Sequence, residues 1–206
     1  MLKLTKQGIA VDIDETLSDT TKYWFEEITK LANPENLSSE EIKKKYRYTH
    51  QVPYWQTEEI SNWLDGKLKD NELQKELLLI ENSNHLLQKI NELIPVVAYI
   101  TARPEIVAEG TKYWLDKHNF PKAELICKPN DETLGGNEWK ANILKDMYPQ
   151  VLGIIDDNPK LAEALGEEYK GVLFLYDHVE IKSNANVVSC LTWEDVYKNV
   201  LDYFKK

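Results

Sequence analysis

The chain has 206 residues, of which 42% are hydrophobic and 29% are charged, an ordinary composition for a folded globular protein. Its formal net charge is −10 and its pI is about 5.0, which argues against general binding to nucleic acid or to anionic membranes. The two cysteines, Cys127 and Cys190, are far apart and lack CxxC spacing, which argues against a disulfide framework and a zinc motif.

The first predicted element is a buried strand over residues 8–13, with the sequence GIAVDI. Its apolar residues run directly into Asp12, Asp14 and Glu15, three carboxylates within four positions. Carboxylates that converge at a strand end repel one another, and burying them without a partner is costly. The stretch therefore needs a compensating positive charge.

A long insert follows this strand. About 80 residues separate it from the next apolar segment, far more than one crossover helix needs. The insert has helical patterns and is interrupted by turn-forming residues at Asn33-Pro34, Pro53 and Asp65-Gly66. We expect a small helical cap over residues 18–85, inserted into a core domain formed by residues 1–17 and 86–206.

The aromatic residues of the insert have two interpretations. A small helical cap needs large side chains for its own core, which is the expected role of Trp24, Phe25 and Trp63. A less regular stretch holds the candidates for stacking on a substrate ring, which are Tyr46, Tyr48, His50, Tyr54 and Trp55.

From residue 95 onward, strands alternate with helices. The expected strands cover residues 95–100, 123–127, 151–155 and 171–176, with a weaker candidate at 187–191. The expected helices cover residues 105–118, 139–148, 160–165 and 192–204, the last with Thr192 as a candidate N-cap. Continuous apolar runs are typical of a parallel sheet that is covered on both faces. We therefore expect an α/β fold, with a doubly wound, parallel, Rossmann-like sheet.

The carboxyl ends of the predicted strands carry polar side chains that can converge. In an open parallel sheet, ligands bind beyond these ends. In chain order, the strand ends supply Asp12, Asp14 and Thr16, then Thr101 and Arg103, then Lys128, and then Asp156 and Asp157. Mg²⁺ prefers oxygen ligands, usually a few carboxylates with water and substrate phosphate. We expect Mg²⁺ as the cofactor, with Asp12, Asp156 and Asp157 as its carboxylate ligands.

The spacing of Asp12 and Asp14 suggests a shared reaction. Side chains two positions apart on an extended segment point the same way, so both carboxylates can face one reacting group. One carboxylate can attack phosphorus while the other handles a proton. Thr101 can offer its hydroxyl to a phosphate oxygen, and a lysine near the metal can neutralise developing charge.

These motifs resemble those of the haloacid dehalogenase (HAD) superfamily of phosphohydrolases. The family pattern is Asp-x-Asp-x-Thr after the first strand, a Ser or Thr after the second, a Lys, and an acidic pair after a late strand. The corresponding segments here are DIDET, ITAR, a lysine, and IIDD. The resemblance covers roughly residues 7–20 and 95–180, and four elements in the same order make it specific.

The resemblance implies roles for individual residues. Asp12 would be the nucleophile that forms an aspartyl-phosphate. Asp14 would protonate the leaving group, activate water and place its backbone carbonyl on Mg²⁺. Thr16 would support the loop, and Thr101 would hold a phosphoryl oxygen. An Asp at position 14 is typical of the phosphatases of this superfamily and is absent from its dehalogenase branch, whereas Glu15 stands where Gly is often found.

The remaining ligands follow from the same resemblance. Asp156 would bind Mg²⁺, and Asp157 would bind it directly or through water. The phosphate-binding lysine is either Lys128 or Lys140, and Lys140 is favoured because a helix start just before the acidic strand points at the site. Apart from this resemblance, Arg103 either binds the substrate phosphate or pairs with a surface carboxylate.

Simpler interpretations of these motifs remain open. Thr101 can cap a helix that begins at Pro104, and the sequence DDNP can form a turn and helix N-cap.

The position of the insert and the run ITARPEIVAEGTKYWLDKH resemble the 5'(3')-deoxyribonucleotidase-like branch of the superfamily. This implies a Mg²⁺-dependent phosphomonoesterase that acts on a small phosphorylated substrate, such as a nucleotide. A polynucleotide-end phosphatase and a broad sugar-phosphate phosphatase are the alternatives among enzymes. A phospho-receiver-like switch and a catalytically silent binding module are the alternatives among other classes of protein.

The expected location is the cytoplasm. The N-terminal sequence MLKLTKQG lacks the apolar stretch of a signal peptide, and no apolar run approaches the roughly 20 residues of a membrane span. We expect no membrane partner and no general nucleic-acid partner, and the sequence leaves a homo-oligomer open.

Overall fold

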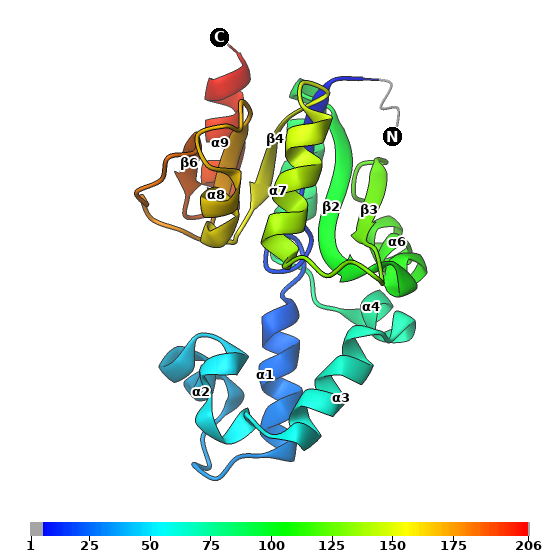
Figure 1. Ribbon diagram of the computed structural model, residues 1–206, viewed down its shortest axis with the longest axis vertical. Coiled ribbons are helices and arrows are strands. Elements are labelled where there is room, and N and C mark those ends of the chain that lie inside the picture. Colours follow the sequence, from blue (N-terminus) through cyan, green and yellow to red (C-terminus); the bar gives the residue numbers. More distant parts are fainter. Residues whose placement is uncertain (1–5, 206) are drawn as a thin grey trace.

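The computed structural model describes residues 6–205, so residues 1–5 of the predicted core segment and Lys206 lie outside the described residues. Figure 1 shows a sheet with helices on both sides and a group of helices beneath it. The strands are β1 (Gly8–Val11), β2 (Val96–Pro104), β3 (Glu124–Lys128), β4 (Val151–Asp156), β5 (Val172–Tyr176) and β6 (Val187–Cys190).

Helices lie between consecutive strands from β2 to β5, as the sequence predicts, and further helices lie before β2 and after β6. They are α1 (Thr20–Leu31), α2 (Ser39–Tyr46), α3 (Glu58–Leu68), α4 (Asn71–Glu76), α5 (Ser83–Leu93), α6 (Ala108–Lys117), α7 (Gly136–Met147), α8 (Pro159–Leu165) and α9 (Trp193–Phe204). Short 3₁₀ turns cover Thr49–Gln51, Pro53–Trp55 and Glu105–Val107. No helix within residues 6–205 is long and apolar enough to cross a membrane.

Within the described residues, the strands form one six-stranded sheet in the order β3-β2-β1-β4-β5-β6. All neighbouring strands pair in parallel, which confirms the predicted doubly wound α/β sheet. The chain adds β2 and β3 on one side of β1 and then returns to place β4 on the other side. The reversal opens a crevice at the carboxyl ends of these central strands, where ligands bind in folds of this kind.

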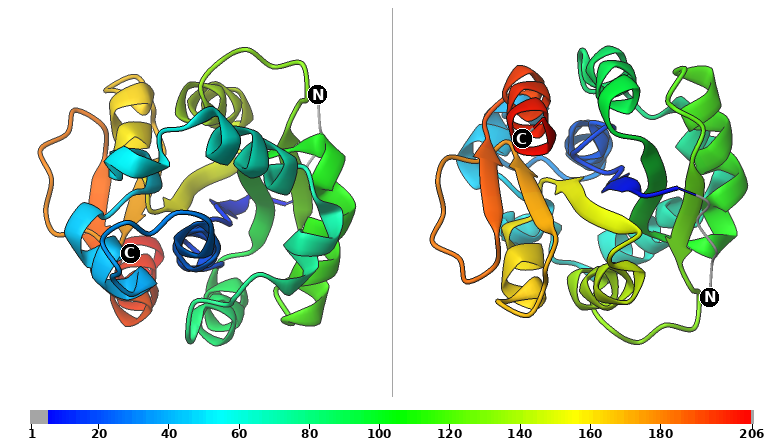
Figure 2. Two further views of the ribbon diagram at one scale, coloured as in Figure 1. Left: turned by 90° about the horizontal axis from the view of Figure 1, so that it is seen from below. Right: turned by 90° about the horizontal axis from the view of Figure 1, so that it is seen from above.

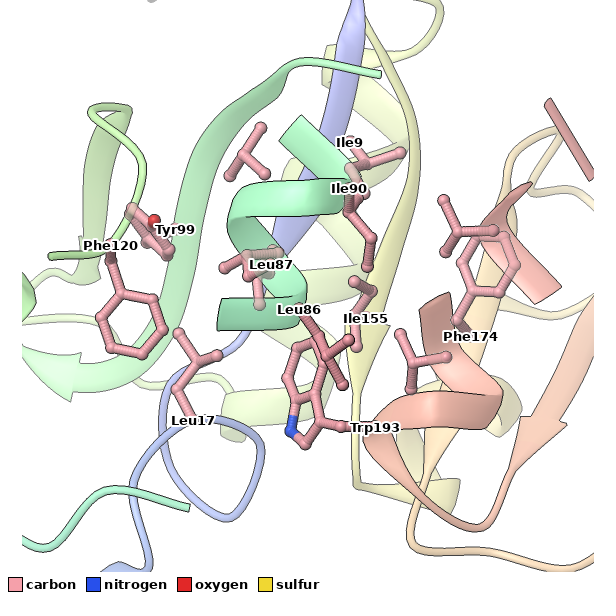
Figure 3. Close-up of a cluster of buried hydrophobic side chains, with 14 of the residues drawn as sticks. Ile9, Leu17, Leu86, Leu87, Ile90, Tyr99, Phe120, Ile155, Phe174 and Trp193 are labelled. Atoms are coloured by element: carbon pink, nitrogen blue, oxygen red, sulfur yellow. The ribbon is translucent and has the colours of Figure 1, made fainter. Parts of the chain in front are cut away.

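Helices cover both faces of the sheet (Figure 2), and a hydrophobic layer lies on each face. On one face, α5, α6 and α9 pack around Leu87, Trp114 and Val196. Figure 3 shows part of this layer, with Leu86, Leu87 and Ile90 lying beside the strands and Trp193 below them. On the other face, α7 and α8 bury Leu144 and Leu161. The strands carry continuous apolar runs because both of their faces are buried.

The strand boundaries differ from the prediction at two places that matter for the site. β1 ends at Val11, so Asp12 already belongs to the following loop. β2 continues to Pro104, because Pro104 still aligns with Lys128 of β3. Thr101 therefore lies inside a strand, and its interpretation as a helix cap is wrong.

The helix boundaries test two local predictions, the N-cap at Thr192 and the turn at Asp65-Gly66. Thr192 caps α9, and its side chain and that of Asp195 form a reciprocal capping box, as expected from their spacing. The turn predicted at Asp65-Gly66 is wrong, because both residues lie within α3. A single Gly in an exposed helix is tolerated at a cost of about 1 kcal/mol.

The helices α1, α2 and α3 share a hydrophobic cluster of their own. Its buried members are Phe25, Ile28, Ile42, Val52, Trp55 and Ile60. Residues further along the insert pack elsewhere, because Leu77 is buried in the cluster on the sheet and Leu73 packs against it. The predicted cap over 18–85 stays a proposal, and this packing favours an end near residue 68.

Gly110 offers a test of how α4 is docked on the core. A Cβ at this position would lie 2.1 Å from the backbone oxygen of Asn71, whereas a Cβ at Gly66 would have no atom within 4 Å. We expect Gly110→Ala to destabilise the protein by about 1–3 kcal/mol through overpacking. Gly66→Ala should stabilise it by about 0.5–1 kcal/mol through helix propensity. Urea unfolding of both variants measures this difference, and equal effects would contradict the docking of α4 described here.

Candidate active site

The loop after β1 is held in place by backbone contacts with elements that are distant in sequence. The N–H of Asp12 donates to the carbonyl of Ile155 at 2.9 Å, which ties the start of the loop to β4. The indole N–H of Trp193 donates to the carbonyl of Thr16 at 3.0 Å. Glu15 adopts a positive φ of 58°, a conformation in which Gly is unstrained. The loop is therefore a fixed platform for its side chains.

Three carboxylates meet at the carboxyl ends of β1 and β4. Asp12, Asp156 and Asp157 each place one carboxylate oxygen within 4.8 Å of the others. Asp12 and Asp156 are buried, and Asp157 is half-buried. The Oδ1 atom of Asp12 is buried and forms no hydrogen bond within residues 6–205. Such an oxygen beside two further carboxylates fits a hard divalent cation, because that ion takes carboxylate oxygens as ligands.

Lys140 supplies the positive charge of this cluster. Its Nζ lies 2.8 Å from Oδ2 of Asp12 and 2.7 Å from Oδ2 of Asp156, and its side chain is only 4% exposed. Lys140 lies on α7, just before β4, where the sequence favoured it. Lys128 ends β3, separated from β1 by β2, and none of the ion pairs among the described residues includes it. The geometry therefore favours Lys140 over Lys128.

The electrostatics of the cluster show that one ammonium group does not balance three carboxylates. Burial raises the pKa of Asp12 to about 7; the charge of Lys140 opposes this shift, and Asp156 adds to it. Burial, together with the neighbouring charges of Asp156 and Asp12, also raises the pKa of Asp157 well above its ordinary value. A bound cation would relieve both effects.

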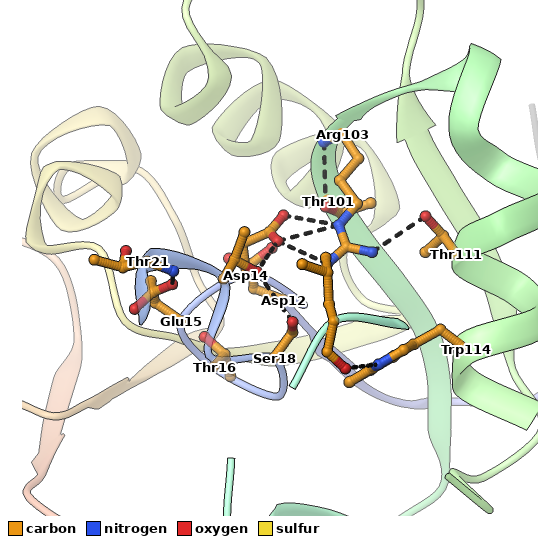
Figure 4. A network of polar contacts seen from close by, with 12 residues as sticks. Asp12, Asp14, Glu15, Thr16, Ser18, Thr21, Thr101, Arg103, Thr111 and Trp114 are labelled. Carbon is orange, nitrogen blue, oxygen red and sulfur yellow. Dashed lines mark hydrogen bonds and ion pairs between the residues drawn. The ribbon is translucent and has the colours of Figure 1, made fainter. Parts of the chain in front are cut away.

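Asp14 has a cation of its own (Figure 4). The Nε of Arg103 lies 3.0 Å from Oδ2 of Asp14, and its Nη2 lies 2.7 Å from Oδ1. The hydroxyl of Thr20 donates to the same carboxylate at 2.6 Å, and Nη1 of Arg103 donates to Thr111. Burial alone would raise the pKa of Asp14, but Arg103 and Thr20 outweigh it and lower the pKa. Of the two roles considered for Arg103, the structure shows the pairing with a carboxylate.

The predicted threonines occupy positions beside the two clusters. Thr101 is fully buried in β2, next to β1, and its Oγ1 accepts from the backbone N–H of Arg103 at 3.2 Å. Thr16 is also buried, and its hydroxyl donates to Asp157 at 3.4 Å. The phosphate-binding role of Thr101 and the loop-supporting role of Thr16 stay predictions. The carboxylate of Asp14 is not part of the triad, and the expected contact of its backbone carbonyl with the metal stays a prediction.

Two cavities open beside the loop, and each has walls from both the cap and the core. The first, of about 510 Å³, includes Glu15 and Asp157 together with Lys43, Arg47 and Tyr48 of the cap. The second, of about 380 Å³, includes Asp14 and Arg103 together with Trp24, Lys69 and Gln74.

Among the cap aromatics considered as stacking platforms, Trp55 does not qualify. It is buried in the cap cluster and donates its indole N–H to the carbonyl of Ala32 at 2.8 Å. Tyr48 is 40% exposed and faces the first cavity, so it remains a candidate.

Sequence reasoning missed three polar side chains around these clusters: Thr20, Gln74 and Thr111. The sequence offered one signal for the placement of Arg103, which contacts Thr111: its spacing from Thr101. Side chains two apart on a strand share a face, so both residues of the ITAR motif were due to point to the same side of β2.

A protein-family model matches the part of the chain that carries the site residues after the first loop. The model of the family described as "PITM 1-3, LNS2 domain" matches residues 71–184, which is more than half of the chain. The chain belongs to this LNS2 domain family. The match takes in Thr101, Lys140, Asp156 and Asp157, and it begins after the loop that carries Asp12. No curated protein matches the sequence significantly.

Solved structures extend the likeness of this LNS2 family member to the whole chain. A HAD-superfamily hydrolase from Ehrlichia chaffeensis is 16% identical, with a TM-score of 0.55, and the match covers 96% of this chain and 98% of that one. Two structures of a dehalogenase, one with an intermediate complex, are each 13% identical with a TM-score of 0.58 and the same coverage. At these identities the likeness establishes a HAD-like fold.

Proposed function

We propose that the protein is a Mg²⁺-dependent phosphomonoesterase that forms a phosphoryl intermediate on Asp12. The observation that carries this proposal is the triad of Asp12, Asp156 and Asp157, with Lys140 between its two buried members and one carboxylate oxygen of Asp12 without a hydrogen bond from the described residues. The HAD-like fold and the name of one relative, a hydrolase, are consistent with it. An Asp at position 14 favours the phosphatase branch over the dehalogenase branch.

Each side chain of the cluster has a role in this proposal. Asp12, Asp156 and Asp157 would hold Mg²⁺, which when bound supplies positive charge to the substrate phosphate. The carboxylate of Asp12 attacks phosphorus, and the ester oxygen leaves with its organic group. Lys140 orients Asp12 and stabilises the negative charge of the transferring group. Thr101 donates its hydroxyl to a phosphoryl oxygen.

The ion pair of Asp14 sets a condition on its proposed role. The contacts with Arg103 and Thr20 orient the carboxylate of Asp14 and keep it ionised, but the lowered pKa also makes it a weaker acceptor for a proton from water. Protonation of the leaving group requires Asp14 to carry a proton, which the positive charge of Arg103 opposes. The pair must therefore loosen when substrate binds.

The proposed substrate is a small phosphate ester, with a nucleotide as the first candidate. The support for this choice is the resemblance to deoxyribonucleotidases and the presence of Tyr48 and Trp24 in the two cavities next to the site. A sugar phosphate and a polynucleotide end are the alternatives within the same chemistry.

Hydrolysis of p-nitrophenyl phosphate tests the proposed function. We expect turnover with Mg²⁺, loss of activity with EDTA and recovery when Mg²⁺ is added back, because the unpaired carboxylate cluster needs the cation. Incorporation of phosphate without turnover would instead indicate a phospho-receiver. Neither turnover nor incorporation would indicate a silent binding module.

A further inference from the structure

The second cavity is bordered by Gln74, whose side-chain amide forms no hydrogen bond with another described residue. Gln74 is only 3% exposed and borders this cavity, and none of the side-chain hydrogen bonds among residues 6–205 involves it. Burying an amide without a partner is unfavourable, and most buried polar groups in proteins are hydrogen-bonded. The amide of Gln74 is therefore placed to pair with something that enters the cavity.

The position of Gln74 is fixed by the docking of α4. Asp70 caps this helix, accepting from the N–H groups of Glu72 and Leu73. Asn71 joins it to the core, because its Nδ2 donates to the carbonyl of Ile106 at 2.7 Å and its Oδ1 accepts from the N–H of Gly110 at 2.7 Å. A side chain held on a docked helix loses little further freedom when it binds a ligand.

The walls around Gln74 favour a planar, uncharged group. Trp24 borders the cavity, and Tyr23 and Trp63 pack edge-to-face against its ring, with centroids 5.1 Å and 6.2 Å away. Both cations of the walls are paired, Arg103 with Asp14 and Lys69 with Asp65 at 2.7 Å, and the carboxylate of Glu15 accepts from the N–H of Thr21. The first cavity differs, because the described residues contain no ion-pair partner for its Arg47.

We propose that Gln74 and Trp24 bind part of the leaving group of the substrate, and that this part is a planar ring with a hydrogen-bonding edge, such as the base of a departing nucleoside. A glutamine amide presents a donor and an acceptor side by side, which matches such an edge. Asp14, two residues from Asp12, lines the same cavity, so a phosphate at Asp12 would place its organic group nearby. The inference rests on the proposed function and names the residues that select its substrate.

Substrate preference tests this role directly. The probes are AMP, GMP, CMP and UMP, each compared with ribose 5-phosphate, which lacks the base. We expect the wild-type protein to prefer at least one nucleotide in kcat/KM. Gln74→Met should lower that preference about tenfold, mainly through KM, because it removes the hydrogen bonds and keeps the side-chain size. Glu72→Gln, on the exposed side of the same helix, is the matched control and should keep the wild-type preference.

Thermal unfolding separates recognition from a structural role. Gln74→Met should leave the unfolding midpoint of the free protein unchanged or raise it, because the amide forms no hydrogen bond with another described residue that the substitution would remove. A lowered midpoint together with an equal loss toward all substrates would overturn the proposal. An unchanged preference in Gln74→Met, or no preference in the wild-type protein, would overturn it as well.

Binding of the nucleosides themselves, measured by titration calorimetry, distinguishes a failure of the proposed function from a failure of the recognition role of Gln74. Nucleosides carry no phosphate, so their binding does not depend on hydrolysis. If the wild-type protein hydrolyses no ester but binds a nucleoside that Gln74→Met binds less tightly, the proposed function fails and the recognition role stands. If no nucleoside binds, or the variant binds it equally well, the recognition role fails.

Discussion

Replacement of Asp12 by Asn should reduce the hydrolysis of p-nitrophenyl phosphate by at least about 10³-fold, the scale seen when a catalytic nucleophile is removed. An amide of the same shape cannot form the acyl-phosphate bond that the proposed intermediate requires. The fold should persist, because Lys140 keeps its contact with Asp156 at 2.7 Å. The substitution also removes one of three mutually repelling carboxylates.

Asp146→Asn is the matched control for this experiment. Asp146 is exposed on α7, the helix that carries Lys140, and its substitution should leave the rate unchanged. Mass spectrometry of the quenched wild-type reaction should find one added phosphoryl group on the peptide that contains Asp12. A variant Asp12→Asn that keeps more than about a tenth of the wild-type activity would rule out nucleophilic catalysis by this residue.

Replacement of Lys140 by Met should lower the free energy of unfolding by about 3–5 kcal/mol, because it leaves the buried carboxylates of Asp12 and Asp156 without their counter-charge. Removing one partner of a buried pair costs more than the pair contributes, since the remaining charge stays out of water. Urea unfolding without metal measures this loss. Mg²⁺ should recover part of it, because an ion that binds only the folded state stabilises that state.

Lys145→Met is the control on the same helix. Lys145 lies 3.7 Å from Glu168, and these side chains are 31% and 82% exposed. An exposed pair of this kind contributes at most about 1 kcal/mol, so its loss should be small and insensitive to Mg²⁺. Equal effects of the two substitutions would contradict the assignment of Lys140 as the counter-charge of the triad.

The convergence of the acidic triad was predictable from sequence because it depends on topology alone. Asp12 and Asp156 each follow an apolar run, and parallel strands bring such ends to one edge of the sheet. Lys140 was predictable for the same reason, since the helix that precedes a strand begins near the carboxyl edge. The length of the insert predicted helices between the first two strands, and α1 to α5 lie there, whereas its division from the core as a cap stays a proposal.

The partners of Asp14 were not settled by local spacing. Sequence reasoning placed Asp12 and Asp14 on an extended segment, but β1 ends at Val11 and the loop turns through the positive φ of Glu15. As a result, Asp12 pairs with Lys140 and Asp14 pairs with Arg103. Arg103 lies 89 positions from Asp14 in the chain. Such a contact depends on the register of β2 beside β1, which a single sequence does not reveal.

The placement of Gln74 also depends on a contact between residues far apart in the chain. The pairing of Asn71 with Gly110 spans 39 positions and has no pattern in the sequence. Trp55 shows the opposite problem, because its irregular surroundings suggested a surface role and its indole instead closes the core of the cap.

The two segments that lead into and out of the helical insert run side by side. Ser18 forms an antiparallel bridge with Leu79, the N–H of Asp19 donates to the carbonyl of Leu78, and the N–H of Ile80 donates to the carbonyl of Leu17. The insert therefore leaves and rejoins the sheet domain at adjacent points, and α4 adds a second attachment through Asn71. Modules attached in this way can be exchanged between relatives, or grafted by protein engineers, while the path of the host chain stays the same.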